Sequence, residues 1–214
     1  MTIALLALLG FVAGVYLRPV AAAFESDPAD TRAEARRAAR AALVPPIPAW
    51  PPLVELGTAA VVALISWRAA EPYLVAFVFA GLAGTLLALI DWRTYRLPDV
   101  ITLPAAAITA LLLIPTGQVV AGLIGAAALT AFYGVLWFIR PEAMGLGDVK
   151  LALLIGLVAG SLGWQAWLVA GVGGQVLGAL YGIGVIVVKK RDKKTDIPFG
   201  PFMLLGALAA VCLT

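Results

Sequence analysis

The sequence predicts an all-α integral membrane protein, a bundle of about eight transmembrane helices with both termini outside. Apolar residues make up 63% of the 214 and charged residues only 13%, well below the roughly 25% of soluble domains. Apolar runs recur along the chain between polar or Pro/Gly breaks. Because a membrane helix needs about 20 residues and lipid cannot satisfy backbone polar groups, the chain has room for about eight such helices and for no soluble domain of ordinary size.

The first apolar run, residues 2–24, is either a signal peptide or a retained helix. Its end, Ala21-Ala22-Ala23, offers small residues for cleavage. However, the cation of this region, Arg18, follows the apolar stretch instead of preceding it, which favours a retained helix with its N-terminus outside. Later apolar runs predict further spans at 52–67, 72–90, 99–115, 119–139, 148–162, 164–188 and 197–213.

The largest polar stretch is residues 25–50. Thr31-x-x-Glu34 fits a capping box, and the Ala/Arg-rich sequence after it predicts a short basic helix. Its arginines at 32, 36 and 40 share one face, which either lies against anionic headgroups or is simply solvated. We therefore expect two parts: residues 1–51, an N-terminal transmembrane helix with a short basic cytoplasmic segment, and residues 52–214, the membrane-embedded bundle.

The basic residues orient the predicted spans. If the spans alternate in direction, the loops on one side carry 14 of the 15 basic residues and leave only Arg68 on the other. This asymmetry is typical of the cytoplasmic side. Asp91 then ends the third span and Asp148 begins the sixth on that same side. Because helices three and six can be neighbours in a bundle, the two carboxyl groups can meet.

Ionisable groups at membrane depth cost free energy and usually mark function. The chain has no histidine and one cysteine, which excludes a His-dependent triad, a disulfide framework and a Cys-rich zinc site. Acid/base chemistry would therefore fall to carboxylates, with no metal and no cofactor required. Two carboxylates at short range share one proton, so that one activates water while the other hydrogen-bonds the attacked carbonyl.

The stretch Gly145-Leu-Gly-Asp148 has two interpretations. In the first, Gly145 and Gly147 permit unusual backbone angles and close approach of an extended substrate, and the helix dipole favours a charged Asp148. In the second, the stretch is only a loop that ends in a helix N-cap, a role that short acids commonly play. The four residues alone do not decide between them.

The surrounding sequence resembles the type IV prepilin peptidases, membrane aspartic proteases of the GxGD class, over about residues 72–205. Three segments in order carry the resemblance: Asp91-Trp-Arg-Thr-Tyr-Arg-Leu-Pro-Asp99, Glu142-Ala-Met-Gly-Leu-Gly-Asp-Val-Lys-Leu151 and Ile197-Pro-Phe-Gly-Pro-Phe202.

This resemblance implies that Asp91 and Asp148 form the catalytic pair. It also implies removal of a short basic leader from prepilins or pseudopilins, at the cytoplasmic face of the bacterial inner membrane. The substrate's apolar helix would insert among the helices of the enzyme. The residues expected to shape the site are Gly145, Gly147, Pro98, Pro198 and Gly200.

Three other ionisable residues are auxiliary candidates. Asp99 is the rival for the first catalytic position, but it follows Pro98 at the start of a span, where an acid is routine as a cap. Glu142 and Lys150 match the surroundings of the second motif. A loop acid and a snorkelling cation explain them without catalysis.

The chain departs from many prepilin peptidases in one segment. Bifunctional members also methylate the new N-terminus, using S-adenosylmethionine and a longer segment after the first helix that often carries four cysteines. Here that segment is residues 25–50 and has no cysteine. We therefore expect a short form with peptidase activity alone.

Two other functions are compatible with the same acids. A presenilin-like intramembrane protease shares the Gly-x-Gly-Asp motif, but such proteins pair it with Tyr-Asp and Pro-Ala-Leu segments, whereas Asp91 follows Ile90. An ion- or proton-coupled transporter would use the acids for cation binding, yet the chain shows no internal repeat. The expected partners are the precursor substrates and the lipid bilayer. Nucleic acid is not expected, and the sequence does not indicate an oligomeric state.

Overall fold

The computed structural model describes residues 2–44, 50–142, 144–189 and 198–214. These residues form α-helices, one short 3-10 helix and their connections, with no strand among them, which confirms the all-α prediction. The helices are α1 (Thr2–Ala22), α2 (Thr31–Leu43), α3 (Leu53–Arg68), α4 (Leu74–Thr94), α5 (Asp99–Leu112), η1 (Ile114–Thr116), α6 (Val119–Ile139), α7 (Leu146–Leu162), α8 (Trp164–Lys189) and α9 (Gly200–Leu213).

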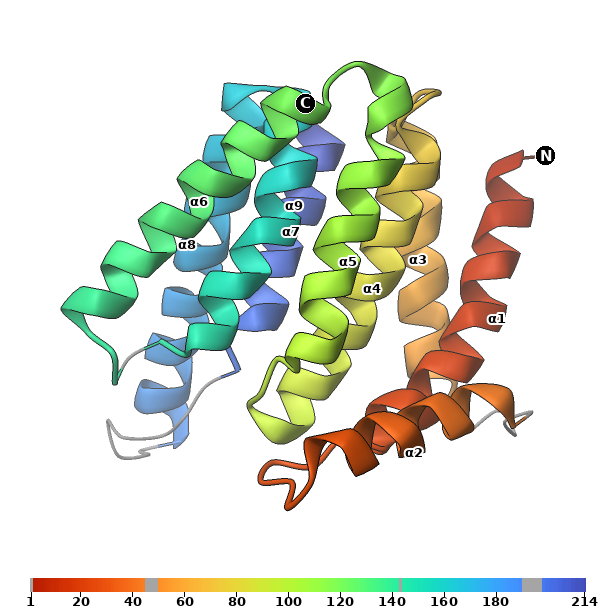
Figure 1. Ribbon diagram of the computed structural model, residues 1–214, viewed down its shortest axis with the longest axis vertical. Coiled ribbons are helices and arrows are strands. Elements are labelled where there is room, and N and C mark those ends of the chain that lie inside the picture. Colours follow the sequence, from red (N-terminus) through yellow and green to blue (C-terminus); the bar gives the residue numbers. More distant parts are fainter. Residues whose placement is uncertain (1, 45–49, 143, 190–197) are drawn as a thin grey trace.

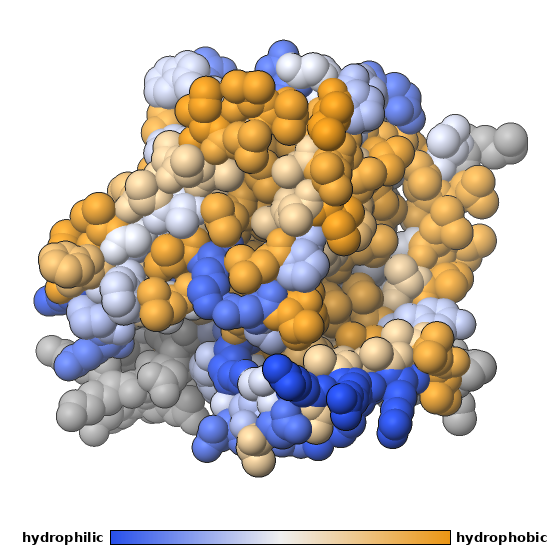
Figure 2. Space-filling view, in the orientation of Figure 1, coloured by the Kyte–Doolittle hydropathy of each residue, from blue (hydrophilic) through white to orange (hydrophobic). Residues whose placement is uncertain are grey.

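Eight of these helices run roughly along one axis, and α2 lies across one end of the bundle (Figure 1). Helix α1 begins and α9 ends at the opposite end (Figure 1). Figure 2 shows mainly apolar side chains over the bundle and hydrophilic ones at the α2 end. This pattern is typical of a helix bundle whose sides face lipid and whose ends face water.

In the described part of the chain, five stretches are long and apolar enough to cross a membrane: α1, α4, α5 continued through η1, α6 and α8. Helices α3, α7 and α9 have 16, 17 and 14 residues. Because these three helices are shorter, a crossing of the membrane by eight helices remains a prediction.

The predicted spans match the helices to within a few residues, with three differences near the acids. Helix α4 continues to Thr94, so Asp91 lies inside its last turn instead of ending the span. Helix α7 begins two residues before Asp148. The last helix begins at Gly200, whereas the predicted span begins at residue 197, which lies outside the described part of the chain.

Helix α7 is the centre of the bundle. Its residues Leu151, Leu154 and Ile155 are almost completely buried, and it packs against α5, α6, α8 and α9. A helix that is apolar and covered all round lies in the interior. Four helices of the bundle therefore pack directly around the helix that carries Asp148.

Glycines let α6 and α7 approach closely. A Cβ atom added at Gly156 would lie 2.5 Å from the Cα atom of Ala126 and 2.6 Å from the carbonyl oxygen of Gly125. Both are backbone atoms, which no side-chain rotation can move away. Small residues at such crossings allow helix packing in membranes.

We expect Gly156→Leu to lower thermal stability in detergent. Overpacking of this kind costs about 1–3 kcal/mol, so the melting temperature should fall by several degrees. Gly184→Leu in α8 is the matched control, because nothing lies within 4 Å of a Cβ atom there. Equal melting temperatures for the two variants would contradict the packing.

Candidate active site

Asp91 lies in the last turn of α4 and is only 4% exposed. The helix ends at Tyr95, whose backbone N–H donates to the Asp91 carbonyl oxygen at 2.9 Å. Tyr95 has φ 55°, in the left-handed region that residues other than glycine seldom adopt. This conformation reverses the chain toward the buried Pro98, which precedes α5.

The beginning of α9 holds the Asp91 carboxylate. The backbone N–H of Gly200 donates to Asp91 Oδ2 at 2.9 Å. Gly200 is the first residue of α9, where backbone N–H groups have no partner within the helix. A Cβ atom added to Gly200 would lie 2.9 Å from the same Oδ2. Pro198, just before it, is buried.

Asp148 is the third residue of α7 and is 6% exposed. Its Oδ2 accepts from the backbone N–H of Gly145 at 3.1 Å, and its own N–H donates to the Gly145 carbonyl oxygen at 3.1 Å. The N-cap is therefore Gly145, so the interpretation of Asp148 as the N-cap is wrong. Its carboxylate still binds the first turn, where the helix dipole favours negative charge.

The two carboxyl groups come together at the α2 end of the bundle. Helices α4 and α7 contact each other, and both acids are buried where the last turn of α4 and the first turn of α7 lie. Each acid has one oxygen held by a glycine N–H from a different helix start. The structure thus supplies two buried, adjacent and separately oriented carboxyl groups.

The glycines before Asp148 do not have the unusual angles that we expected. Gly145 has φ −77°, and the positive-φ glycines in the described ranges are Gly117 and Gly163. Gly147 lies against Leu97 of this chain, since a Cβ atom there would lie 3.0 Å from the Cβ atom of Leu97, and the expected approach of a substrate to these glycines stays a prediction. At Gly145 the nearest atom would be Asp148 Oδ2 at 3.6 Å, an ordinary contact.

The auxiliary candidates lie at the edge of this site. Lys150 Nζ donates to both carboxylate oxygens of Asp99 at 2.7 Å. This ion pair is partly exposed and joins the first residue of α5 to the fifth residue of α7. Glu142 is exposed in the turn before α7. Asp99 therefore forms an ion pair with Lys150. This contact does not support the alternative in which Asp99 takes the place of Asp91 as a catalytic acid.

Sequence reasoning missed Tyr133 of α6. Its side chain is completely buried, its hydroxyl donates to the Gly171 carbonyl oxygen at 3.1 Å, and its ring packs near Phe199. A tyrosine well inside an apolar run, away from its ends, was the signal that could have identified it.

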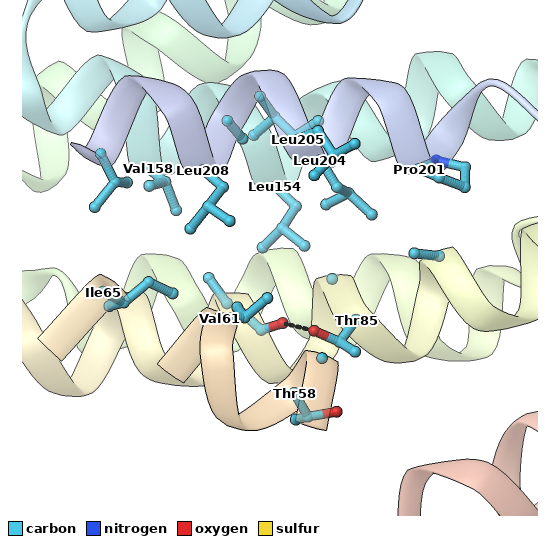
Figure 3. Close-up of a pocket in the computed structure, with 18 of the residues that line it drawn as sticks. Thr58, Val61, Ile65, Thr85, Leu154, Val158, Pro201, Leu204, Leu205 and Leu208 are labelled. Atoms are coloured by element: carbon cyan, nitrogen blue, oxygen red, sulfur yellow. Dashed lines mark hydrogen bonds between the residues drawn. The ribbon is translucent and has the colours of Figure 1, made fainter. Parts of the chain in front are cut away.

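An apolar cavity of about 460 Å³ lies between α3, α4, α7 and α9. Figure 3 shows Leu154, Leu204 and Leu208 from α7 and α9 facing Val61 and Ile65 from α3. The cavity begins at Leu89 and Pro201, next to Asp91 and Gly200, and continues toward the far end of the bundle at Phe77 and Val211. Within the described ranges, no three His, Cys, Asp or Glu residues are grouped so that they could hold a metal ion.

Comparison with known proteins identifies the class to which this fold and site belong. Residues 76–183, which include both acids, match the type IV leader peptidase family. The chain belongs to this family, as its motifs predict. This match favours the prepilin-peptidase hypothesis over the presenilin-like and transporter alternatives.

Several relatives bear the name prepilin leader peptidase/N-methyltransferase. The protein of Pseudomonas putida is 32% identical over 169 residues, 75% of this chain and 57% of the relative. That of Aeromonas hydrophila is 32% identical over 182 residues, 78% and 59% of the two chains. That of Bacillus subtilis is 34% identical over 99 residues, 46% and 39%. The chain thus spans less than three-fifths of these relatives, and no solved structure matches it significantly.

Proposed function

We propose that this protein is a membrane aspartic endopeptidase that removes the short basic leader from type IV prepilin or pseudopilin precursors. One observation carries the proposal: Asp91 and Asp148 are both buried, on two contacting helices, α4 and α7, at one end of the bundle. Both lie in motifs that resemble those of the family. The names of the relatives supply the substrate class.

The hydrogen bonds suggest how the pair would act. In the described part of the chain, the bonds from Gly200 and Gly145 engage Oδ2 of each acid, which leaves Oδ1 for water and substrate. One acid is ionised and takes a proton from the attacking water, while the protonated acid donates to the scissile carbonyl oxygen. The same two groups then return a proton to the leaving amine.

We place the site at the cytoplasmic face of the bacterial inner membrane, with eight crossings and both termini outside. The observation that supports this orientation is that α2, which carries arginines, lies at the same end of the bundle as both acids (Figure 1). Basic segments are retained on the cytoplasmic side. A basic leader would reach the pair from that side.

We further propose that the apolar cavity receives side chains of the substrate's apolar segment. Its lining along α9, from Pro201 to Val211, corresponds to about 15 Å of helix. Its near end touches the residues around Asp91. An apolar segment seated there would present the junction with its basic leader to the two acids.

Blocking the cavity tests this part of the proposal. Gly57 of α3 lines the cavity, and nothing lies within 4 Å of a Cβ atom there. We expect Gly57→Phe to raise the KM for a prepilin several-fold with little change in melting temperature. Gly184→Phe, at an equally open and exposed position on α8 that does not line the cavity, should leave the KM unchanged. Equal KM values for the two variants would contradict a role of the cavity in substrate binding.

We also propose that the protein is a peptidase alone, with no cofactor, because residues 25–50 contain no cysteine. The main experiment is co-expression with a candidate prepilin, in which leader removal is followed by gel shift. Mass spectrometry of the product then gives the cleaved bond and any methyl group on the new N-terminus. An uncleaved precursor would contradict the proposal of peptidase activity. A methylated product formed by this protein alone would contradict the proposal that it lacks methyltransferase activity.

A further inference from the structure

The short basic segment packs on the outside of the active site. Ala38 of α2 and Phe24 before it form a buried cluster with Ala21 of α1 and Ile90 of α4. Ile90 immediately precedes Asp91 and is completely buried. In Figure 1, α2 crosses one end of the bundle with its first residues toward the junction of α4 and α5. The segment is therefore in contact with the helix end that carries the first acid.

A buried carboxylate lies within this contact. Glu34 is 2% exposed, and its Oε1 accepts from the backbone N–H of Glu25 at 2.8 Å. The expected capping box is therefore wrong: the N-cap of α2 is Asp30, whose side chain accepts from the N–H of Arg32. Glu34 instead turns inward, away from the helix start.

Arg96 joins this carboxylate to the connection between α4 and α5. Its Nη1 donates to the Glu25 carbonyl oxygen at 2.5 Å and lies 3.5 Å from Glu34 Oε1. The Arg96 side chain is 31% exposed and that of Glu34 only 2%, so water screens this pair less than it screens a fully exposed one. Glu34 and Arg96 therefore hold each other in place.

The residue after Arg96 contacts the start of α7, next to the second acid. Leu97 is buried and lies against Gly147, as shown by the 3.0 Å between its Cβ atom and a Cβ atom added there. Gly147 immediately precedes Asp148. Residues 95–98 thus touch the ends of both helices that carry the acids, and Arg96 is anchored to α2.

We propose that Glu34 is a positioning residue for the active site, acting through Arg96. The pair fixes residues 95–98, and these fix the distance between Asp91 and Asp148. The inference rests on the proposed function, since the reaction needs both acids in register with the scissile bond. Misplacing a catalytic group by about 1 Å can cost up to about 10²-fold in rate.

The test compares kcat and KM of purified variants on a prepilin. Glu34→Gln keeps the size of the side chain and an acceptor for the Glu25 N–H but removes the charge that faces Arg96. We expect kcat to fall about ten-fold, with KM and melting temperature nearly unchanged. Glu25→Gln is the matched control, because it breaks the exposed 3.0 Å ion pair of the same segment with Arg37 and keeps the carbonyl that Arg96 uses.

A double-mutant cycle separates positioning from simple stabilisation. Arg96→Gln should lower kcat as much as Glu34→Gln, the double variant should fall no further, and Arg96→Lys should recover part of the rate. A purely structural role would lower melting temperature and yield but leave kcat per folded molecule unchanged. If Glu34→Gln does not fold, the kcat of Arg96→Gln tests the proposal by itself.

A wild-type kcat in Arg96→Gln, or equal kcat in Glu34→Gln and Glu25→Gln, would overturn the proposal. Failure of the proposed function is a different result: the unmodified protein would not cleave, or the variants of Asp91 and Asp148 would still cleave.

Discussion

Replacing either Asp91 or Asp148 by Asn is expected to abolish leader removal. Each Asn keeps an oxygen that can accept from the N–H of Gly200 or Gly145, at the positions now 2.9 and 3.1 Å away. The side chains should therefore stay in place, while the ability to take and return a proton is lost. Losing general acid or base catalysis costs about 10²–10⁴-fold, and here the same two acids act both in the attack of water and in the departure of the amine.

Asp99→Asn is the matched control for this experiment. Asp99 is exposed and paired with Lys150, and an exposed ion pair contributes about 0–1 kcal/mol. We expect near-normal cleavage, measured as the fraction of prepilin converted in co-expression and as kcat for the purified protein. Normal processing by both Asp91→Asn and Asp148→Asn would contradict the two-carboxylate mechanism.

The second large effect is expected at Gly200. A Cβ atom there would lie 2.9 Å from Asp91 Oδ2 and 3.3 Å from its Cγ atom, so Gly200→Ala must move either the carboxylate or the start of α9. Either movement weakens the hydrogen bond that orients Asp91. We expect kcat to fall by about 10²-fold, with the protein still folded.

Gly145→Ala provides the comparison for Gly200→Ala. Its added Cβ atom would lie 3.6 Å from Asp148 Oδ2, and its φ of −77° suits alanine. The same substitution beside the other acid should therefore retain most of the activity. Equal losses in the two variants would show that the spacing around Asp91 is not what limits the reaction.

Much of the fold follows from local pattern. The fifth predicted span, residues 119–139, coincides with α6. The end of α8 differs from the prediction by one residue. Long apolar runs between Gly, Pro and charged residues leave the backbone one way to satisfy its polar groups in lipid, as a helix. The errors lie at helix ends, where capping depends on contacts outside the run.

The acids themselves were also visible in the sequence. Asp91 and Asp148 stand out because charges in apolar surroundings are costly, and the positive residues placed them at one end. The hydrogen-bond partners of the two acids were harder to identify from the sequence. Gly200 was selected only by resemblance, while its N–H donation to Asp91, 109 residues away in the chain, required the packing of α9 against α4.

By itself, the sequence determined the helical class, the order of the helices, the family and the two acids, because each depends on residue type and local spacing. Only the tertiary structure decided that Glu34 faces Arg96 instead of capping α2, that Lys150 pairs with Asp99, and that Gly147 lies against Leu97. The physical reason is that these contacts join residues at least 50 positions apart. Such pairs form only once the apolar faces of the helices have packed and set the approach of their ends.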